Sequence, residues 1–584
     1  MSSLLQYATL LLVQLLVLFV FLVAIGDGTV DIKLICNTTS YPDSCYNSLA
    51  TIAAMSRGHH EVYRLSVQVA SEEVSRASDG FLQLQEEFKN ISDAMSLRAV
   101  QVCHDLFSIA ARCLIDSWRP ANIHDAFADL NIWLTAAGTH QHSCVSAMDD
   151  AKDATLRRKV LKNLEKSTKL TSNSLAILRA FQESMVDRSK VNTEDQHTVS
   201  ASAAKSIGLI RESRKLGSGG MPRWMDSKER RWLRTPTGNL QIDAVVAKDG
   251  SGEFSKICDA LKAVPDNCVK RFVVYVKRGV YNENVRVEAT KSNVMMIGEG
   301  MEATVVSAAL NFVDGTPTFD TATFCVFGAG FIARDMGFQN TAGAAKRQAI
   351  ALMADGDRGV FYRCKFDGFQ DTLLAHAYRQ FFRHCHIYGT VDFIFGDAAA
   401  VFQDCNILPR RPLPGQQNII TAQGKTDSRG ASGFSIQDCK LYPAENLAGA
   451  TTFLGRPWKT YSTTVFIRTY MGSFIHPKGW VPFRGTMAPD SIYYAEFENQ
   501  GPGAVTANRV QWKDNGHGCN AIQGGNNMRK TAAAQHPGRR RHSGRRRLPA
   551  SPSSSVEEGH WSPSSTEKKA TQAALATGKR SPFR

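Results

Sequence analysis

Apolar residues recur at spacings of three and four along the first third of the chain, between about residues 31 and 190. Two such stripes are Leu97, Val100, His104, Phe107, Ala111 and Leu114, and then Ile123, Phe127, Leu130 and Leu134. These spacings place the side chains on one face of a helix, which is typical of packed amphipathic helices. We therefore expect an all-α helical bundle over residues 31–190, with no catalytic constellation of its own.

From about residue 238 the pattern changes to short β-rich runs separated by Gly, Asp and Asn, such as Phe272–Val276 and Val294–Ile297. Four similar five-residue runs are centred on Cys364, Cys385, Cys405 and Cys439, which step by 21, 20 and 34 residues. Steps of about 20 residues with short strands are typical of a solenoid of stacked coils. The sequence predicts an all-β, right-handed parallel β-helix over residues 238–520, with these cysteines in its core.

Three further segments have distinct compositions. Residues 1–25 contain a nearly continuous apolar run, which indicates a secretory signal peptide or a membrane anchor, although the usual basic flank is missing. Residues 191–237 are rich in Ser, Gly, Lys and Arg and predict an exposed linker, with candidate processing sites at its basic clusters. Residues 521–584 predict a disordered, basic, Ser/Pro-rich tail. The basic clusters of the linker are Arg214 with Lys215 and Arg230 with Arg231.

The net charge of +15 is mostly a property of the tail. Residues 529–584 contain 13 Lys or Arg and 3 Asp or Glu, so they carry +10. The rest of the chain is only mildly basic, which suits an acidic polymer as partner. Because a secreted chain does not normally meet nucleic acid, we expect no nucleic-acid partner.

The chain contains 13 cysteines, an odd number, so at least one thiol has no partner within the chain. An oxidising compartment permits disulfides. No Cys-x-x-Cys pair occurs, and residues 384–386, His-Cys-His, lie on one short strand-like run without the ligand spacing that zinc requires, so we expect no metal site. The candidate disulfides are a local bridge Cys36–Cys45, an inter-helix bridge Cys103–Cys144 and an inter-coil bridge Cys385–Cys405.

Two aspartates stand at equal offsets from the repeated cysteines. Asp371 follows Cys364 by seven residues, and Asp392 follows Cys385 by seven. Equal offsets on consecutive coils stack, and neighbouring strands lie about 4.8 Å apart. Two carboxylates at that range cannot both ionise freely, so one stays protonated beside a charged partner, which suits acid/base and nucleophilic chemistry. The alternative is a pair of solvated turn aspartates.

Several segments of the second half together resemble plant pectin methylesterases of the precursor type, which carry an N-terminal pectin-methylesterase-inhibitor-like domain. The cysteine pattern around Tyr41 and Pro42 resembles the inhibitor family. The matching segments of the esterase are residues 279–283, 348–352, 370–373, 388–396 and 454–458.

This resemblance implies a secreted plant cell-wall enzyme that hydrolyses methyl esters of homogalacturonan to pectate and methanol. It implies no metal or organic cofactor. The partners that it implies are pectin, a processing protease of the secretory pathway, and the chain's own N-terminal domain as an autoinhibitor or folding partner.

The resemblance also implies roles for single residues. Asp392 would attack the ester carbonyl, and Asp371 would act as general acid and then as general base. Gln348 and Gln370 would donate hydrogen bonds to the oxyanion, and Arg456 would hold Asp392 ionised. The candidates for substrate contact, besides Gln348 and Arg456, are Trp458, Thr318 and Phe393.

The chain departs from the family at three places. Arg347 stands where the family usually has His, and Asp397 stands where it usually has Asn. After about Trp512 the basic tail replaces the segments that close the end of the β-helix. This end favours one alternative, a catalytically inactive protein that binds and restrains other esterases. A second alternative is a glycosidase with two carboxylates, which would be recognised by new reducing ends in place of methanol.

Overall fold

The computed structural model describes residues 31–52, 58–90, 93–149, 151–190, 220–483 and 487–512, with only the backbone of 184–190. The predicted leader at 1–25, the cluster of Arg214 and Lys215, and the predicted tail lie outside these ranges. Within the described ranges, no helix combines the length and the apolar character needed to cross a bilayer.

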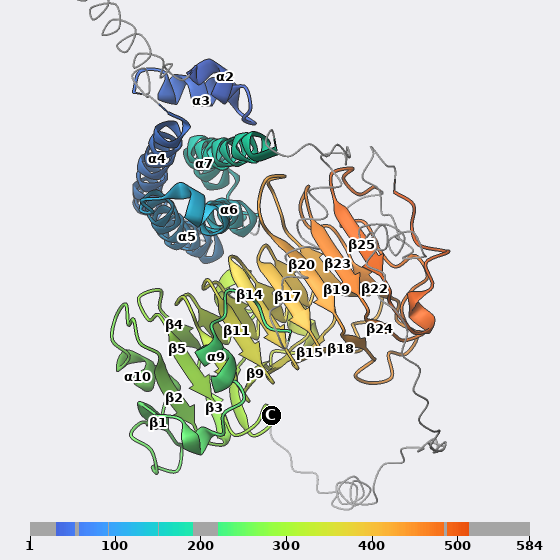
Figure 1. Cartoon of the computed structure of the whole chain (residues 1–584). Coiled ribbons are helices and arrows are strands. Elements are labelled where there is room, and N and C mark those ends of the chain that lie inside the picture. Colours follow the sequence, from blue (N-terminus) through green and yellow to red (C-terminus); the bar gives the residue numbers. More distant parts are fainter. Residues whose placement is uncertain are drawn as a thin grey trace, which may run out of the picture. The chain divides into compact units, whose positions relative to one another are not determined.

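The first part of the described chain is helical, as the apolar stripes predict (Figure 1). The stripe residues Phe107, Leu130 and Leu134 are buried, and the rings of Phe107 and Phe81 meet edge to face at 4.9 Å. The structure contains two of the predicted disulfides, Cys36–Cys45 and Cys103–Cys144. The helices are α2 (Ile32–Cys36), α3 (Pro42–Leu49), α4 (His59–Glu87), α5 (Ala94–Trp118), α6 (Ile123–Ala147) and α7 (Ala154–Lys190).

The second part is a parallel β-helix built from three sheets whose strands pair in parallel. The ten-stranded sheet contains β1 (Ala244–Val246), β2 (Phe272–Val276), β5 (Val294–Ile297), β8 (Ile332–Arg334), β11 (Gly359–Tyr362), β14 (Arg379–Arg383), β17 (Ala399–Gln403), β20 (Gly433–Gln437), β23 (Thr463–Ile467) and β25 (Tyr493–Phe497). The eight-stranded sheet contains β3 (Gly279–Asn282), β6 (Thr304–Ala308), β9 (Gly337–Asn340), β12 (Lys365–Asp367), β15 (His386–Gly389), β18 (Asn406–Pro409), β21 (Lys440–Leu441) and β24 (Tyr470–Met471). The seven-stranded sheet contains β4 (Val285–Val287), β7 (Phe324–Val326), β10 (Leu352–Ala354), β13 (Leu373–Ala375), β16 (Ile394–Gly396), β19 (Asn418–Gln423) and β22 (Thr452–Gly455).

The repeated cysteines mark the bend where the chain leaves the ten-stranded sheet for the eight-stranded one. Cys364, Cys385, Cys405 and Cys439 are all buried, so the prediction that they are core residues is confirmed. The predicted bridge Cys385–Cys405 is wrong, because both are free thiols. Side chains at equivalent positions of parallel strands point the same way, and each sulfur instead donates to a carbonyl of the preceding coil, that of Phe361 at 3.3 Å for Cys385 and that of Phe382 at 3.6 Å for Cys405.

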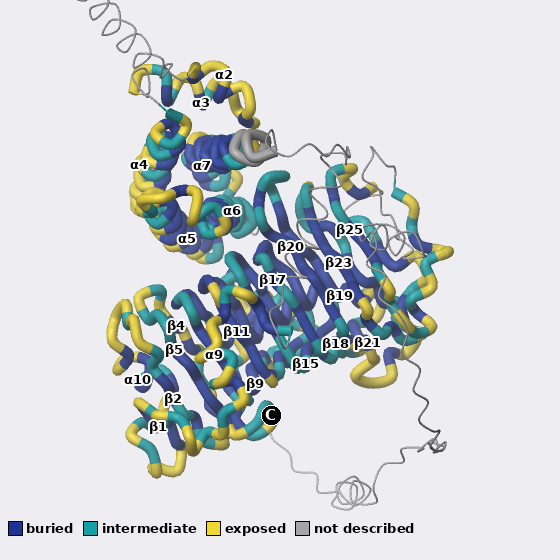
Figure 2. Tube along the Cα trace, in the orientation of Figure 1, coloured by how far each residue is buried: buried dark blue, intermediate teal, exposed yellow. Residues whose placement is uncertain are grey.

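Stacked aromatic rings fill the interior of the solenoid, which Figure 2 shows as buried strands. Phe382 lies between Phe361 and Phe402, with ring centroids 4.9 and 4.7 Å away. All three side chains have no exposed surface. The coils are therefore held together by a continuous ladder of side chains along the core.

Replacing Phe382 by alanine is expected to lower the free energy of unfolding by about 3–5 kcal/mol, because it leaves a cavity between two coils. The measurement is chemical denaturation of the full chain, followed by tryptophan fluorescence. Val280→Ala is the matched control, since Val280 is 49% exposed. Equal losses in the two variants would contradict the ladder's role.

The second half of the predicted linker 191–237 is not a free linker. From Met221 the chain packs on the ten-stranded sheet, and we call residues 220–240 the strap. Met221, Met225 and Leu233 are buried against apolar residues of β5, β8, β11 and β14. Arg334 donates hydrogen bonds to the carbonyls of Trp232 at 2.6 Å and Thr235 at 2.7 Å. The sequence predicted an exposed linker here because the few apolar residues of the strap are widely spaced within a basic stretch.

The candidate processing residues Arg230 and Arg231 lie on the short helix α9 (Ser227–Trp232) within the strap. Arg230 is half-buried, and its guanidinium donates to the carbonyls of Met225 and Pro222. Arg231 is exposed. Cleavage here would require the helix to unwind.

The described chain also closes the C-terminal end of the solenoid, ahead of the departure from the family. Beyond β25, the buried guanidinium of Arg509 pairs with Glu496 at 2.7 and 2.9 Å. Glu496 also accepts a hydrogen bond from the indole of Trp480 at 3.2 Å. Trp512 packs on Tyr494, with ring centroids 6.1 Å apart. Residues 498–512 therefore cover the last coil, so the tail is not needed for this cap.

Candidate active site

The two aspartates singled out by their spacing occupy equivalent positions on neighbouring coils. Asp371 stands two residues before β13 and Asp392 two before β16, and β13 pairs with β16 through Leu373 and Ile394. The amide of Asp371 donates to the carbonyl of Val391 at 3.0 Å. The stacking predicted from the sequence is therefore present in the structure.

Both aspartates adopt a left-handed backbone conformation, with φ of 62° at Asp371 and 51° at Asp392. Aspartate tolerates this region better than most residues, yet the conformation is uncommon outside glycine and tends to occur at functional positions. Both residues are largely buried, 8% and 7% exposed. The pair is thus held in a fixed geometry with little contact with solvent.

Arg456 holds Asp392 through two parallel hydrogen bonds. Nε donates to Oδ1 at 2.8 Å and Nη2 to Oδ2 at 2.5 Å, the fork geometry in which guanidinium and carboxylate match. Arg456 directly follows β22, and its own amide donates to the carbonyl of Thr421 at 2.9 Å. Burial raises the pKa of Asp392, and the hydrogen bonds and charge of Arg456 oppose that rise.

Gln348 and Gln370 lie on the turns that lead into β10 and β13, and both are half-buried. The amide of Ala349 donates to the carbonyl of Gln370 at 3.2 Å, so the two glutamines belong to neighbouring coils. The side-chain oxygen of Gln348 is buried and has no hydrogen-bond partner among the described residues. Gln370 thus shares a coil with Asp371, and Gln348 lies on the coil before it.

The three candidates for substrate contact have different positions. Trp458 is half-buried, with its ring 6.0 Å from that of Phe395. Thr318 begins a short 3₁₀ helix and is half-buried. Phe393 is fully buried in the core of the solenoid, so its predicted role in substrate contact is wrong.

Arg347 and Asp397 are the two residues near this site that differ from the family pattern. Arg347 is exposed, with φ of 60°. Asp397 is buried and accepts hydrogen bonds from Gln423 at 3.0 Å and from Thr139 of α6 at 2.7 Å. Desolvation raises the pKa of Asp397, but its hydrogen bonds serve the contact between helix and solenoid rather than the catalytic pair.

Helices of the bundle contact the seven-stranded sheet beside this site. Leu374 and Phe395, which alternate with inward-pointing residues of β13 and β16, belong to the same apolar cluster as the bundle core. Trp458 packs against that cluster. The ammonium of Lys459 donates to Ser146 of α6 at 2.8 Å. The bundle therefore covers the outer face of the sheet beside the candidate catalytic aspartates and the candidate sugar-binding tryptophan.

One cluster that the sequence analysis missed also lies at this contact. His140 of α6 meets Asp355 and His376 of the solenoid, all three buried. More than 200 residues separate His140 from the other two, so no local motif could have shown the cluster.

The fold is a parallel β-helix, and its candidate site holds two neighbouring carboxylates, one of them paired with an arginine. This combination is typical of a hydrolase that uses one carboxylate as nucleophile and the other as acid and base. Comparison with known proteins makes this specific. The family model described as Pectinesterase matches residues 243–532, and the one described as Plant invertase/pectin methylesterase inhibitor matches residues 30–177. The chain belongs to the pectinesterase family and is a carboxylic ester hydrolase preceded by an inhibitor-type domain.

Two plant pectinesterases that the chain resembles over most of its length agree with this assignment. The chain is 45% identical to probable pectinesterase/pectinesterase inhibitor 46 of Arabidopsis thaliana over 486 residues, which cover 83% of this chain and 82% of the relative. It is 42% identical to pectinesterase 3 of Phaseolus vulgaris over 502 residues, 82% and 81% of the two chains. The solved pectin methylesterase from carrot is 46% identical, with a TM-score of 0.47, over 48% of this chain and 88% of that one.

Proposed function

We propose that the protein hydrolyses the methyl esters of pectin with Asp392 as nucleophile and Asp371 as acid and base. The observation that carries these roles is the paired fork of Arg456 on Asp392. A cation in that position favours the ionised carboxylate, which is the form that attacks. Asp371 stands at the equivalent position of the adjacent coil, and this place beside the ionised Asp392 suits the protonated partner.

In the first step an oxygen of Asp392 attacks the carbonyl carbon of the methyl ester. Asp371 gives its proton to the departing methoxide, which leaves as methanol, and an anhydride links the sugar carboxyl to Asp392. Asp371, now ionised, takes a proton from water, and the hydroxide releases the galacturonate and restores Asp392. The reaction needs only these two carboxyl groups and water.

The amides of Gln348 and Gln370 are the donors that we assign to the oxyanion of each tetrahedral intermediate. Preorganised donors of this kind typically contribute 10²–10³-fold to kcat. Trp458 offers an aromatic face to the polysaccharide, and Thr318 remains a further candidate for substrate contact. The mildly basic body favours the approach of the acidic polymer.

The burial of Asp392 leads to a pH prediction. Because its folded-state pKa lies above 3.8 and the nucleophile must be ionised, kcat/KM is expected to fall as pH drops through that raised pKa. Arg456→Gln removes the opposing cation and is expected to move this acid limb to higher pH. The measurement is methanol release between pH 3 and 8. An acid limb that stays in place in Arg456→Gln would contradict the role of the pair.

We also propose that the bundle keeps the enzyme latent until the linker is cut. The bundle packs against Trp458 and the seven-stranded sheet, which supports inhibition by coverage. Cleavage near Arg214 and Lys215 suits a protease better than cleavage at Arg230 and Arg231, since these two lie on helix α9. Secretion to the cell wall completes the proposal, and the apolar residues 1–25 support it.

The proposal is tested by product analysis on highly methylesterified pectin, with protein cleaved at a protease site inserted near residue 205. We expect methanol without new reducing ends, and a loss of about 10²–10³-fold in kcat for Gln370→Ala. New reducing ends would favour the glycosidase alternative. Folded, cleaved protein that releases no methanol would favour the binding-protein alternative.

A further inference from the structure

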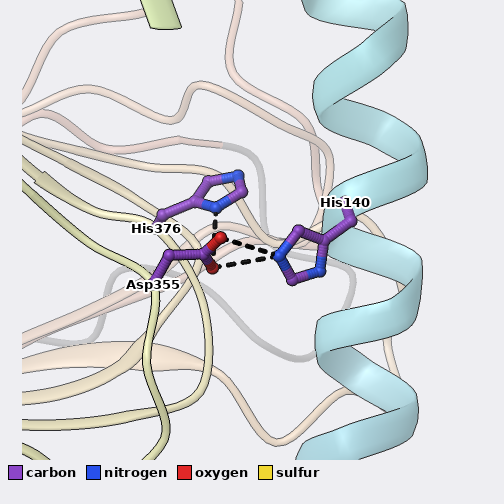
Figure 3. Close-up of side chains that lie close together, drawn as sticks. All are labelled: His140, Asp355 and His376. Carbon is purple, nitrogen blue, oxygen red and sulfur yellow. Dashed lines mark hydrogen bonds and ion pairs between the residues drawn. The ribbon is translucent and has the colours of Figure 1, made fainter. Parts of the chain in front are cut away.

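Two histidines and an aspartate from distant parts of the chain converge between the bundle and the solenoid. Figure 3 shows His140 of α6 facing Asp355, which follows β10, and His376, which follows β13. Nε2 of His140 lies 2.9 and 3.0 Å from the two oxygens of Asp355, and Nδ1 of His376 lies 2.9 Å from one of them. The side chains are 0%, 0% and 3% exposed.

The other nitrogen of each imidazole already has a partner. Nδ1 of His140 lies 2.6 Å from the carbonyl of Ala136, and Nε2 of His376 lies 2.7 Å from the hydroxyl of Ser143. These contacts fix each ring so that its second nitrogen faces Asp355. A histidine whose outer nitrogen is hydrogen-bonded to a carbonyl or hydroxyl is the usual arrangement of a metal-binding imidazole.

The contact of His376 with Asp355 is close but poorly aligned. Although Nδ1 lies 2.9 Å from the carboxylate, it makes no hydrogen bond with acceptable geometry to any described residue. A proton on this buried nitrogen would not point at the carboxylate, so protonation of the ring does not by itself give Nδ1 a well-formed hydrogen bond. An ion placed among the three groups would use this nitrogen.

We propose that His140, Asp355 and His376 form a binding site for a divalent first-row transition metal ion of the zinc type, which joins the bundle to the solenoid. The three ligand atoms lie within 4.8 Å of one another. Two imidazoles and one carboxylate are a ligand set that holds zinc in proteins, and zinc favours nitrogen and oxygen donors in this number. Binding releases the proton that lies between Nε2 of His140 and Asp355.

The surroundings of the cluster are compatible with such a site. His376 also lines a small pocket at the same contact, together with His142, Ser143 and Trp458. The titratable groups that face His140, besides the two other ligands, are Cys113 of α5 and Tyr378. None of the three ligands belongs to the catalytic set, so the inference does not depend on the proposed function.

Because one ligand comes from the bundle and two from the solenoid, the complete site exists only when the two are in contact. The bound ion therefore stabilises the contact by its binding free energy. Chelation is expected to loosen the contact without removing any residue of the catalytic site.

The test is metal binding by the untagged full-length protein, using Zn²⁺ in equilibrium dialysis and Co²⁺ as a spectroscopic probe. We expect about one ion per chain and the visible absorption of a low-coordinate Co²⁺ site. His140→Gln and His376→Gln are each expected to weaken binding by at least about 100-fold. His142→Gln is the matched control, because His142 is a half-buried histidine of the same helix that is not one of the three ligands.

Circular dichroism of each variant shows whether it has folded, and the Co²⁺ spectrum of the unmodified protein requires no variant. The proposal is overturned if the unmodified protein binds neither ion in the micromolar range. It is equally overturned if folded His140→Gln and His376→Gln bind the ions as the unmodified protein does.

Discussion

Asp392→Asn is expected to lower methanol release by at least about 10³-fold, because an amide cannot form the acyl intermediate. Asparagine tolerates the left-handed backbone at this position, φ 51°, so the fold should survive. The substitution also removes the charged partner of Arg456, whose side chain is only 23% exposed to water. We therefore expect a modest loss of stability in addition to the loss of activity. The measurement is initial-rate methanol release by protein that lacks the bundle.

The protein for this measurement should begin at Gly220 rather than at residue 238. A start at 238 would remove Met221, Met225 and Leu233 and expose the apolar face that they cover. Asp397→Asn is the matched control, since it makes the same change at a buried aspartate five residues further along. The asparagine keeps an oxygen that can accept the hydrogen bond from Gln423. If Asp392→Asn retained activity similar to this control, Asp392 would not be the nucleophile.

Thr139→Glu is expected to raise methanol release by the intact, uncut chain at least about tenfold. Thr139 is 4% exposed and donates to Asp397 at 2.7 Å, so glutamate brings a second carboxylate and extra bulk against a buried one. Like charges across a contact cost several kcal/mol, and about 1.4 kcal/mol corresponds to a factor of ten. The bundle would then leave the sheet beside the active site more often.

Thr139→Ser is the control, because serine keeps the hydroxyl that donates to Asp397. We expect it to be as latent as the unmodified chain. Cutting the linker should bring the serine and glutamate variants to the same activity. If uncut Thr139→Glu released methanol no faster than uncut Thr139→Ser, coverage by the bundle would not be the cause of latency.

Most of what the sequence predicted about the β-helix domain came from the regular spacing of its coils. The runs around Cys364 and Cys385 repeat at the solenoid period, and the register of the strands follows that repeat, with Tyr362 opposite Arg383. Because the offset to Asp371 and Asp392 is the same on both coils, one count predicted both the coil period and the neighbouring positions of the two aspartates. Sequence periodicity is informative here because each coil contacts only its neighbours.

Features that depend on the direction of single side chains were less predictable. Phe393 directly follows Asp392 but is buried in the core of the solenoid. Cys385 and Cys405 occupy equivalent positions on neighbouring coils, yet they form no disulfide. The contact between His140 and Asp355 depends on the docking of two domains, which no local pattern encodes. The strap was hidden because three widely spaced apolar residues in a basic stretch resemble a linker.

The linker determines how concentration affects the inhibitor. The bundle ends at Lys190 on one side of residues 191–219, and the strap fixes Gly220 to the ten-stranded sheet on the other. A segment of that length spans at most about 100 Å, so a bundle that leaves its sheet remains at an effective concentration of roughly millimolar. In the proposed mechanism, latency before cleavage is therefore independent of how dilute the protein is. After the proposed cleavage the same contact becomes bimolecular, so dilution favours the separated bundle and the active enzyme.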